Sequence, residues 1–385
     1  MISIDKKQNC CGCEACIQRC PKSCIQMQQD TEGFLYPVVD TESCIDCGIC
    51  EKICPILNQS NEKKPLTVYA AKCKDESLRL ESSSGGIFTL LANEIIRENG
   101  VVFGAKFNSK WEVIHDYATT AEELAQFRGS KYVQSKIGQS YQQVLHFLKG
   151  GGNVLFSGTP CQIAGLKLFL QKDYENLITV DFICHGVPSP EVWRLYLNDI
   201  LHKRQSIPEN IRFRDKRSGW KKYSLSISFK KMNTCTKKLT FAQSVYENLY
   251  LRGFLANLYL RPSCHHCPSK SFKSNSDITI ADFWGIESLL PNWNDDRGVS
   301  LVMLNSPLGE RIFGNINTTH QECEYREIIP LNPAIVHSAP AHIYRTDFFH
   351  DLNTHKYSIS SLVLKYCFTP RERIKRIIKK WSGIK

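Results

Sequence analysis

The sequence lacks any uncharged apolar run of about 18 residues, the length that a helix needs to cross a bilayer. Its first residues, Met1 to Lys7, lack the apolar segment of a secretory signal. No Gly-x-Gly-x-x-Gly opens a helix after a strand, so an ordinary Rossmann dinucleotide site is not supported. The biased composition of disordered or fibrous proteins is also missing, since 42% of the residues are hydrophobic and 23% are charged. We therefore expect a globular cytoplasmic protein without a membrane span.

Cysteine is the residue that stands out, because the chain of 385 residues holds 18 of them and ten lie within the first 54 positions. A reducing cytoplasm does not maintain structural disulfides, so clustered thiols indicate metal ligands. The ten cysteines include two copies of one pattern, Cys-x2-Cys-x2-Cys-x3-Cys-Pro, over residues 10–21 and 44–55. Bacterial ferredoxins use this run for a pair of [4Fe-4S] clusters, and the fourth cysteine of each run ligates the other cluster.

The pattern predicts two ligand sets in an α+β ferredoxin-like domain over residues 1–60. The expected ligands of one cluster are Cys10, Cys13, Cys16 and Cys54, and those of the other are Cys44, Cys47, Cys50 and Cys20. Two zinc sites are the alternative, although zinc prefers separated CxxC pairs. Cys11 and Cys24 fall outside the pattern, and we interpret them as ordinary small buried residues.

The remaining chain alternates expected strands and helices, which is typical of an α/β domain with parallel strands. Residues 61–66 are expected to form a polar linker, residues 67–345 the α/β domain, and residues 346–385 a basic tail. The periodicity predicts strands at 67–73, 101–107, 111–117, 153–157 and 177–183. It predicts helices at 87–99, 121–127 and 139–149, a helix that begins after residue 162 and ends near 170, and a helix from 190 to about 204. A hairpin is expected at 223–239.

A second group of cysteines falls in this α/β domain. Cys161 and Cys184 each follow an expected strand, and ligands in open α/β sheets bind beyond the carboxyl ends of the strands. Both thiols should thus face one crevice, and Cys264 with Cys267 would bring the number of thiolates to four, enough for a third cluster. Two alternatives stay open. Cys264 and Cys267 could bind a zinc ion together with the two histidines between them. Alternatively, Cys161 could be a nucleophile at a helix N-terminus.

Six motifs of the α/β domain are diagnostic when they are taken together. They are Ser83-Ser-Gly-Gly86, Gly129-Ser-Lys-Tyr-Val-Gln-Ser135, Ser157-Gly-Thr-Pro-Cys-Gln162, Ile183-Cys-His-Gly186, Cys264-His-His-Cys267 and Ser276-Asp-Ile-Thr-Ile-Ala-Asp-Phe-Trp-Gly285. With these motifs the chain resembles the coenzyme F-420 hydrogenase/dehydrogenase beta-subunit family, in the version that carries a fused two-cluster ferredoxin. The resemblance runs from Cys10 to about Gly314.

The resemblance implies a flavoprotein, usually with FAD, that passes electrons between iron–sulfur clusters and an organic two-electron carrier. It implies that residues 67–345 are a flavin-binding catalytic domain. It also implies that Cys161, Cys184, Cys264 and Cys267 hold a third [4Fe-4S] cluster near the flavin. Copies with the Cys-His-Gly-Val-Pro-Ser-Pro motif resemble a bacterial branch associated with cell-surface polysaccharide genes. The family name does not establish the use of F-420.

Polar and glycine motifs supply the candidate flavin contacts. Free N–H groups before a helix suit a phosphate, a lysine adds a cation, and an aromatic ring suits the isoalloxazine. The alternatives are a plain helix cap at residues 84–86, a solvated loop at 129–132 and a capped turn at Asp282. Lys131, His185 and Asp282 are the candidate catalytic residues. The full set of expected contacts is Ser83, Ser84, Gly85, Gly86, Gly129, Ser130, Lys131, Tyr132, Thr159, Gln162, Asp282 and Trp284.

The formal charge is +11, and residues 371–385 hold seven Lys/Arg and a single Glu. Four apolar residues of this segment fall on one stripe of a helix, which suits an anionic membrane surface and would make the protein peripheral to the inner membrane face. A terminal helix packed on its own domain is the alternative. Nucleic-acid binding is not expected, because no recognition motif is present. The basic surface would instead guide an acidic ferredoxin or a phosphorylated substrate.

The sequence thus predicts an iron–sulfur flavoprotein reductase with two ferredoxin clusters, a third cluster and FAD or another flavin. Its expected partners are a redox protein such as ferredoxin and a small-molecule acceptor. Two other classes remain, a non-catalytic electron-relay subunit of a larger oxidoreductase and a zinc-structured interaction protein.

Overall fold

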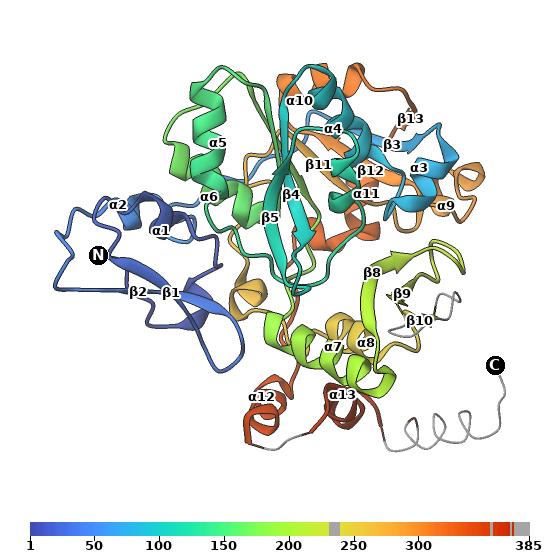
Figure 1. Cartoon of the computed structure of the whole chain (residues 1–385). Coiled ribbons are helices and arrows are strands. Elements are labelled where there is room, and N and C mark those ends of the chain that lie inside the picture. The colour runs from blue at the N-terminus through green and yellow to red at the C-terminus, as the bar shows by residue number, and fades with distance from the viewer. Residues whose placement is uncertain (231–238, 355–356, 370–371, 373–385) are drawn as a thin grey trace.

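A mixed sheet of eight strands forms the centre of the computed structural model, which describes residues 1–230, 239–354, 357–369 and 372 (Figure 1). The strands lie in the order β13-β3-β12-β11-β7-β6-β4-β5. Their bounds are β3 (Thr67–Cys73), β4 (Val101–Phe107), β5 (Val113–Ala118), β6 (Val154–Ser157), β7 (Leu177–Phe182), β11 (Ile278–Asp282), β12 (Ser300–Leu304) and β13 (Thr318–Glu322). The strands expected from periodicity at 67–73 and 101–107 are confirmed, and the other three differ by one or two residues at an end.

The expectation of a parallel sheet is correct only for the middle of this sheet. Strands β4, β6, β7 and β11 run parallel to one another, whereas the pairs β4–β5, β11–β12, β12–β3 and β3–β13 are antiparallel. At the β5 edge, the antiparallel pairing follows from the length of the connection. Residues 108–112 join β4 to β5, and so short a connection can only form a hairpin, because a parallel partner requires a crossover of about a dozen residues or more.

Helices cover both faces of the sheet. One face packs against α4 (Ile87–Arg97) and α10 (Pro307–Gly314), and the other packs against α5 (Ser140–Lys149) and α6 (Pro160–Leu170). Residues of β4 divide between the two faces, since Val102 belongs to the first core and its neighbours Val101 and Phe103 to the second. This alternation is the period of two that a strand imposes on its side chains.

A second body of structure packs below the sheet in Figure 1. Its small antiparallel sheet joins β9 (Ser224–Lys230) to both β8 (Ile207–Asp215) and β10 (Leu239–Ser244). The β9–β10 pair is antiparallel as expected, but β10 begins only at Leu239, so the second strand lies almost wholly beyond the predicted range 223–239. Ser189 accepts a hydrogen bond from the Val192 N–H and caps α7 (Pro190–Arg204) as expected. The remaining helices of this body are α8 (Leu249–Leu255), α12 (Arg345–Thr354) and α13 (Ile359–Cys367).

Part of the expected tail belongs to this body. Helices α12 and α13 bury Phe348, Leu362 and Val363 completely in the core that includes α7 and α8. Helices α12 and α13 therefore pack against the domain, because their apolar side chains match the apolar faces of neighbouring helices. The stripe expected within 371–385 lies outside the described residues. Within the described ranges, no helix has both the length and the apolar character needed to cross a membrane.

Two other expected elements differ in detail. The helix predicted for 121–127 is the 3-10 helix η2 (Glu123–Phe127). Helix α4 ends at Arg97 with Glu98 as its C-cap, and the Gly100 N–H donates to the Ile95 carbonyl beyond the cap. Shorter helices complete the description: α3 (Glu76–Glu81), α9 (Ile286–Leu289) and α11 (Tyr325–Leu331).

The amino-terminal region is docked on the large domain through buried polar contacts. It consists of α1 (Ala15–Arg19), β1 (Ile25–Gln29), β2 (Leu35–Val39) and α2 (Ile49–Lys52). Glu14 accepts hydrogen bonds from the N–H groups of Ile137 and Gly138 at 3.0 and 2.9 Å. Glu32 forms a two-point ion pair with Arg345. These contacts fix the cysteine-rich region against the end of the large sheet.

Candidate functional site

The first cysteine site is a cavity lined by Cys10, Cys13, Cys16 and Cys54, the four residues expected to share a cluster. Helix α1 carries Cys16, and the segment before it carries Cys10 and Cys13. Gly12 in this turn has φ +69°, a left-handed conformation that favours glycine. A Cβ atom here would lie 2.8 Å from Nη1 of Arg261. The turn therefore needs glycine for both its backbone and its close approach to Arg261.

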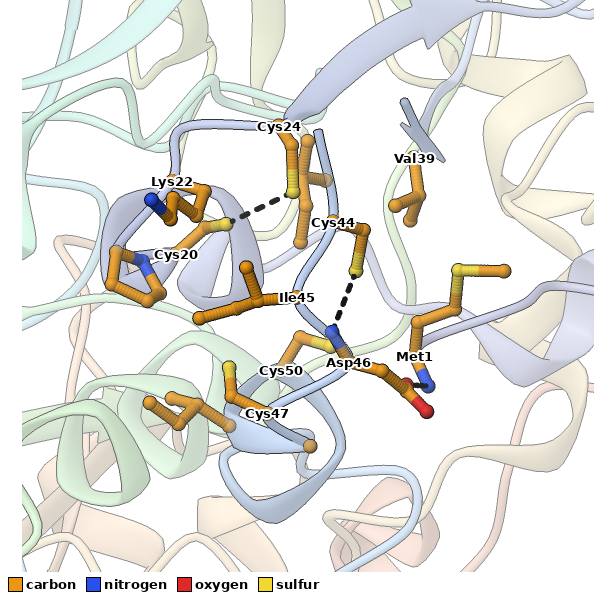
Figure 2. A pocket seen from close by; sticks show the side chains of 14 residues that line it. Met1, Cys20, Lys22, Cys24, Val39, Cys44, Ile45, Asp46, Cys47 and Cys50 are labelled. Atoms are coloured by element: carbon orange, nitrogen blue, oxygen red, sulfur yellow. Dashed lines mark hydrogen bonds and ion pairs between the residues drawn. The ribbon is translucent and has the colours of Figure 1, made fainter. Parts of the chain in front are cut away.

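The second cysteine site is the cavity in Figure 2, lined by Cys20, Cys44, Cys47 and Cys50 together with Cys24. Cys20 comes from the first run and lies just after α1, whereas the other three expected ligands belong to the second run. The Cys24 Sγ lies 3.4 Å from the Cys20 Sγ. The fourth cysteine of each run thus lines the cavity of the other run, which is the crossed arrangement expected from the sequence.

The third cysteine site is a cavity at the carboxyl ends of the paired parallel strands β6 and β7. Cys161 lies in the first turn of α6 and Cys184 in the loop after β7. The 3-10 helix η3 (Pro262–His266) carries Cys264, and Cys267 follows it. The structure therefore places the four separated thiols around one cavity. Cys11 also lines this cavity, although its neighbours Cys10 and Cys13 line the first site.

Local sequence explains how Cys161 is held. Thr159 is the N-cap of α6, and its side chain and that of Gln162 form a capping box. Gln162 also donates from Nε2 to Ser135 Oγ at 2.9 Å, and Thr159 Oγ1 lies 3.2 Å from the Cys161 Sγ. Both residues line the third cysteine site. Thr159 and Gln162, which were expected to contact the flavin, therefore lie beside the thiols and apart from the other expected flavin contacts, which are described below.

Burial controls the protonation of these thiols. It raises the pKa of Cys264 to about 12 and raises the pKa of Cys184 well above its ordinary value. The Cys11 thiol and burial together raise the pKa of Cys161 well above its ordinary value. At neutral pH such thiols keep their protons unless a metal cation replaces them, because ligand binding to iron releases the thiol proton.

The spacing of the ligand atoms is informative about the kind of metal group. Among the described residues, no three or more His, Cys, Asp or Glu side chains lie close enough to hold a single metal ion. A cubane needs a wider arrangement, since each cysteine binds a different iron. His265 directs Nδ1 to the Ala339 carbonyl at 2.9 Å, while the cavity is lined by the cysteines on either side of it. The thiol cavities fit clusters better than single ions.

Helix α6 packs against the first cysteine site at Gly165. A Cβ atom there would lie 2.9 Å from the Cys13 Cβ and 3.0 Å from its Sγ. Substitution Gly165→Ala would ordinarily favour a helix by up to about 1 kcal/mol. Here we expect the added methyl to displace the Cys13 turn, so that iron is lost to a chelator severalfold faster under anaerobic conditions.

The matched control for this prediction is Gly314→Ala. Gly314 also lies in a helix, but a Cβ atom there would meet nothing within 4 Å. Its iron release should equal that of the parent protein. Equal release rates for both variants would show that the contact between α6 and Cys13 is unimportant for iron retention.

A second group of polar residues forms around Arg214 on β8, and we call it the Arg214 cluster: Ser83, Ser130, Tyr132, Arg214, Trp220, Asp282 and Trp284. Arg214 donates to the Asp282 Oδ1 at 2.9 Å, to the Tyr132 hydroxyl at 3.4 Å and to the Ser83 carbonyl at 3.3 Å. Ser83 Oγ in turn accepts from the Ser130 N–H at 2.7 Å. The cluster thus joins four segments that are far apart in the sequence.

Aromatic rings close this cluster. The Trp220 Nε1 donates to Asp282 Oδ1 at 2.7 Å, and the Trp220 ring stacks on Trp284 with centroids 4.8 Å apart. The Arg214 guanidinium lies over the Tyr223 ring at 4.0 Å. Arg214 is only 6% exposed, and its Nε has no hydrogen-bond partner in the described part of the chain. A buried donor without a partner suits a site that a ligand completes.

The other expected flavin contacts have partners within the protein. Lys131 donates to the carbonyl oxygens of Gln126, Arg128 and Gly129, and burial lowers its pKa to about 7. Ser84 Oγ donates to the Val299 carbonyl at 2.7 Å. A Cβ atom at Gly85 would lie 2.5 Å from the Ala71 carbonyl, so glycine is required there by packing.

The two remaining glycines differ in their surroundings. Gly86 has φ +89° and is the N-cap of α4. Gly129 has φ +81°, with open space where its Cβ would be.

A row of rings connects the Arg214 cluster to the third cysteine site. Tyr132 stacks on Phe254 with centroids 4.7 Å apart, and Phe254 contacts the His185 ring edge-on at 5.2 Å. His185 lines the third cavity and bonds Asn257 through Nε2 at 2.6 Å. Burial lowers the pKa of His185. The structure therefore places this candidate proton donor beside the thiols and Asp282 within the Arg214 cluster.

Sequence reasoning missed five residues that matter in this arrangement: Cys11, Arg214, Lys216, Trp220 and Arg261. Lys216 donates to the carbonyls of Arg79, Ser84 and Arg297. A signal existed for three of them, because the stretch Arg212-Phe-Arg-Asp-Lys-Arg217 is unusually basic and precedes Trp220. Cys11 and Arg261 have no such signal, since their roles depend on contacts between distant segments.

The thiol cavities and the mixed sheet define the class of the molecule, an iron–sulfur electron-transfer protein. A model of the 4Fe-4S binding domain matches residues 37–56. Two further models, for the N-terminal and C-terminal parts of the coenzyme F420 hydrogenase/dehydrogenase beta subunit, match residues 68–140 and 151–329. The chain belongs to this beta-subunit family, as its motifs predict.

Individual relatives agree with this assignment. One of the subunits of the F(420)H(2) dehydrogenase of Methanosarcina mazei is 23% identical over 214 residues, and the alignment covers 50% of this chain and 60% of that relative. A ferredoxin of Mycolicibacterium smegmatis is 40% identical over 43 residues, which are 11% of this chain and 36% of that ferredoxin. The chain thus matches less than two thirds of the length of these relatives.

One solved structure is also similar. A chain of the F420-reducing [NiFe] hydrogenase complex from Methanosarcina barkeri matches with a TM-score of 0.45 and 17% identity, covering 71% of this chain and 88% of that chain.

Proposed function

We propose that this chain is an iron–sulfur flavoprotein oxidoreductase that passes electrons from a ferredoxin-type donor to a small organic two-electron acceptor. The observation that carries the proposal is the continuity of its sites. Cys11 lines both the first and the third cavity, and the rings of Tyr132, Phe254 and His185 join the third cavity to the Arg214 cluster. Such a row of sites is what stepwise electron transfer through a protein requires.

The proposed iron ligands are twelve of the cysteines that line the three cavities, all except Cys11 and Cys24. Four thiolates a site match the needs of a [4Fe-4S] cluster. They are Cys10, Cys13, Cys16 and Cys54 in the first site, Cys20, Cys44, Cys47 and Cys50 in the second, and Cys161, Cys184, Cys264 and Cys267 in the third.

The Arg214 cluster is the proposed flavin site. Its buried guanidinium suits an anionic part of the cofactor, and the rings of Tyr132 and Trp284 suit the isoalloxazine. A flavin supplies the conversion between single electrons and electron pairs that a two-electron acceptor needs. Asp282 fixes the guanidinium by its ion pair, and the backbone near Ser83 and Ser130 is held by their mutual hydrogen bonds.

The test of this proposal is the cofactor content of protein purified without oxygen. We expect about twelve irons, as many sulfides and one flavin for each chain, with EPR signals of reduced [4Fe-4S] clusters. About eight irons with flavin would remove the third cluster and make Cys161 a candidate redox thiol or nucleophile. Eight irons without flavin would overturn the enzyme proposal.

A non-catalytic relay is the second candidate, and the family itself favours it, since the matching models describe a beta subunit and the Methanosarcina mazei relative belongs to a multi-subunit dehydrogenase. Turnover of an organic acceptor by the isolated chain with reduced ferredoxin separates the two candidates. Activity that appears only with a partner oxidoreductase would favour the relay. The ferredoxin partner, the membrane-surface contact and the link to surface polysaccharide metabolism stay predictions.

A further inference from the structure

Arg261 is a fully buried cation at the junction between the cysteine-rich region and the large domain, with 0% of its surface exposed. Its Nε donates to the Cys10 carbonyl at 2.8 Å, and its Nη1 donates to the Gln134 Oε1 at 3.0 Å. Its Nη2 donates to the Leu35 carbonyl at 2.9 Å and lies 3.5 Å from the Cys10 Sγ. The guanidinium therefore reaches the sulfur of a proposed first-site ligand.

The charge of Arg261 lacks a matching anion among these partners. Two are backbone carbonyls and one is a neutral amide. The Glu14 carboxylate attracts the guanidinium from a distance, but its oxygens contact the N–H groups of Ile137 and Gly138 and form no direct ion pair with Arg261 among the described residues. An arginine cannot lose its proton in a protein, and an isolated buried charge is costly unless it is paired. The Tyr36 ring, 4.3 Å from the guanidinium, offers a cation–π contact but no net charge, so a negative group in direct contact would still stabilise this cation.

Proposed ligands of two sites lie next to Arg261, one against its side chain and one against its backbone. Cys10 of the first site touches the guanidinium. Arg261 is also the N-cap of η3, and the Cys264 N–H donates to the Arg261 carbonyl at 2.9 Å. A cluster with four thiolates is anionic, and its negative charge grows by one when it takes up an electron.

We propose that Arg261 is a positioning residue whose buried charge is the counter-ion of the first cysteine site. This inference rests on the proposed function, since it requires iron at that site. When one electron enters the first site, no bond is made or broken and Arg261 keeps its proton. The guanidinium stabilises the added negative charge, so the reduced state at this site is favoured. Among the described residues, the hydrogen bonds of the Arg261 side chain go to Cys10, Gln134 and Leu35 and to no residue that lines the second site, which therefore lies outside this influence.

The experiment is a potentiometric titration with dithionite, followed by EPR, on anaerobically purified protein. Arg261→Gln should reduce the equilibrium constant for reduction of the first site at least tenfold, which is about 59 mV for one electron. Arg261→Lys keeps the charge and should recover most of this loss. The potential of the second site should stay unchanged and serves as an internal control.

Two further variants keep the test decisive if Arg261→Gln fails to hold iron. Gln134→Glu places a carboxylate against Nη1 without removing the guanidinium, and it should lower the same potential. Arg345→Gln is the matched control, because Arg345 is a partly buried arginine of the same region that pairs with Glu32. It should leave the potentials of all sites unchanged.

The outcomes that overturn the proposal differ from those that overturn the proposed function. Unchanged first-site potentials in Arg261→Gln and Gln134→Glu, with iron retained, would end the counter-ion role. Equal shifts in the Gln and Lys variants would show that hydrogen bonding matters and charge does not. A parent protein with about eight irons would remove the third site from the proposed function, but the shift at the first site would still be measurable.

Discussion

Alanine at Cys54 should remove the iron of the first cysteine site and leave the second site filled, although Cys54 belongs to the second run. Cys54 lines the cavity of Cys10, Cys13 and Cys16, so its loss leaves three thiolates for that cluster. Conversely, Cys20→Ala should empty the second site. Each variant should lose about four of the irons found in the parent protein, because one iron of the cubane would be left without its thiolate ligand. Iron and sulfide analysis gives the size of the loss.

EPR of the reduced proteins shows which site is lost. The spectrum of Cys54→Ala should match that of Cys13→Ala and differ from that of Cys47→Ala. Cys24→Ala is the control, since Cys24 lies 3.4 Å from Cys20 but is not a proposed ligand, and it should keep its iron. If the spectrum of Cys54→Ala instead matched that of Cys47→Ala, the fourth cysteines would not be exchanged.

Loss of the Asp282 carboxylate should be the most destabilising change in the Arg214 cluster. In Asp282→Ala, the Arg214 guanidinium would lose its ion pair while its side chain stays only 2% exposed. The Trp220 Nε1 would lose its acceptor in the same step. Removing one partner of a buried pair costs about 3–5 kcal/mol, because the other charge is left uncompensated. A lower urea midpoint for unfolding, measured anaerobically, would report this effect.

The control for this variant is Glu287→Ala, which breaks the ion pair with Lys221. These two side chains are 45% and 43% exposed, so the loss should stay within about 1 kcal/mol. The flavin content should also fall in Asp282→Ala and stay at the parent level in Glu287→Ala. Equal urea midpoints for the two variants would show that Arg214 does not depend on Asp282.

Much of the fold follows from local patterns in the sequence. The strands at Thr67–Cys73 and Val101–Phe107 lie where the apolar residues indicated, and Ser189 caps α7 as its position before Pro190 suggested. The directions of the edge strands were harder to predict, because apolar periodicity identifies a strand but not the direction of its partner. Strand direction depends on the connection and on which edge is free, as the β4–β5 hairpin illustrates.

The candidate site likewise has one part that local sequence patterns predict and one part that they do not. Spacing alone indicated which cysteines belong together, since short loops allow few ways to bring three thiols to one point. The Arg214 cluster could not be predicted, because it joins Ser83, Tyr132, Arg214 and Asp282 from four distant segments. No local pattern indicates that an arginine on β8 will pair with an aspartate at the end of β11.

The sequence by itself determined the ligand pattern, the family and the alternation of strands and helices, because each depends on residues that are neighbours along the chain. The tertiary structure decided where the sites meet. It placed Cys11 at both the first and the third cavity and brought the Arg261 guanidinium to the Cys10 sulfur. Such contacts depend on the docking of one region against another, and that docking is set by packing over the whole molecule.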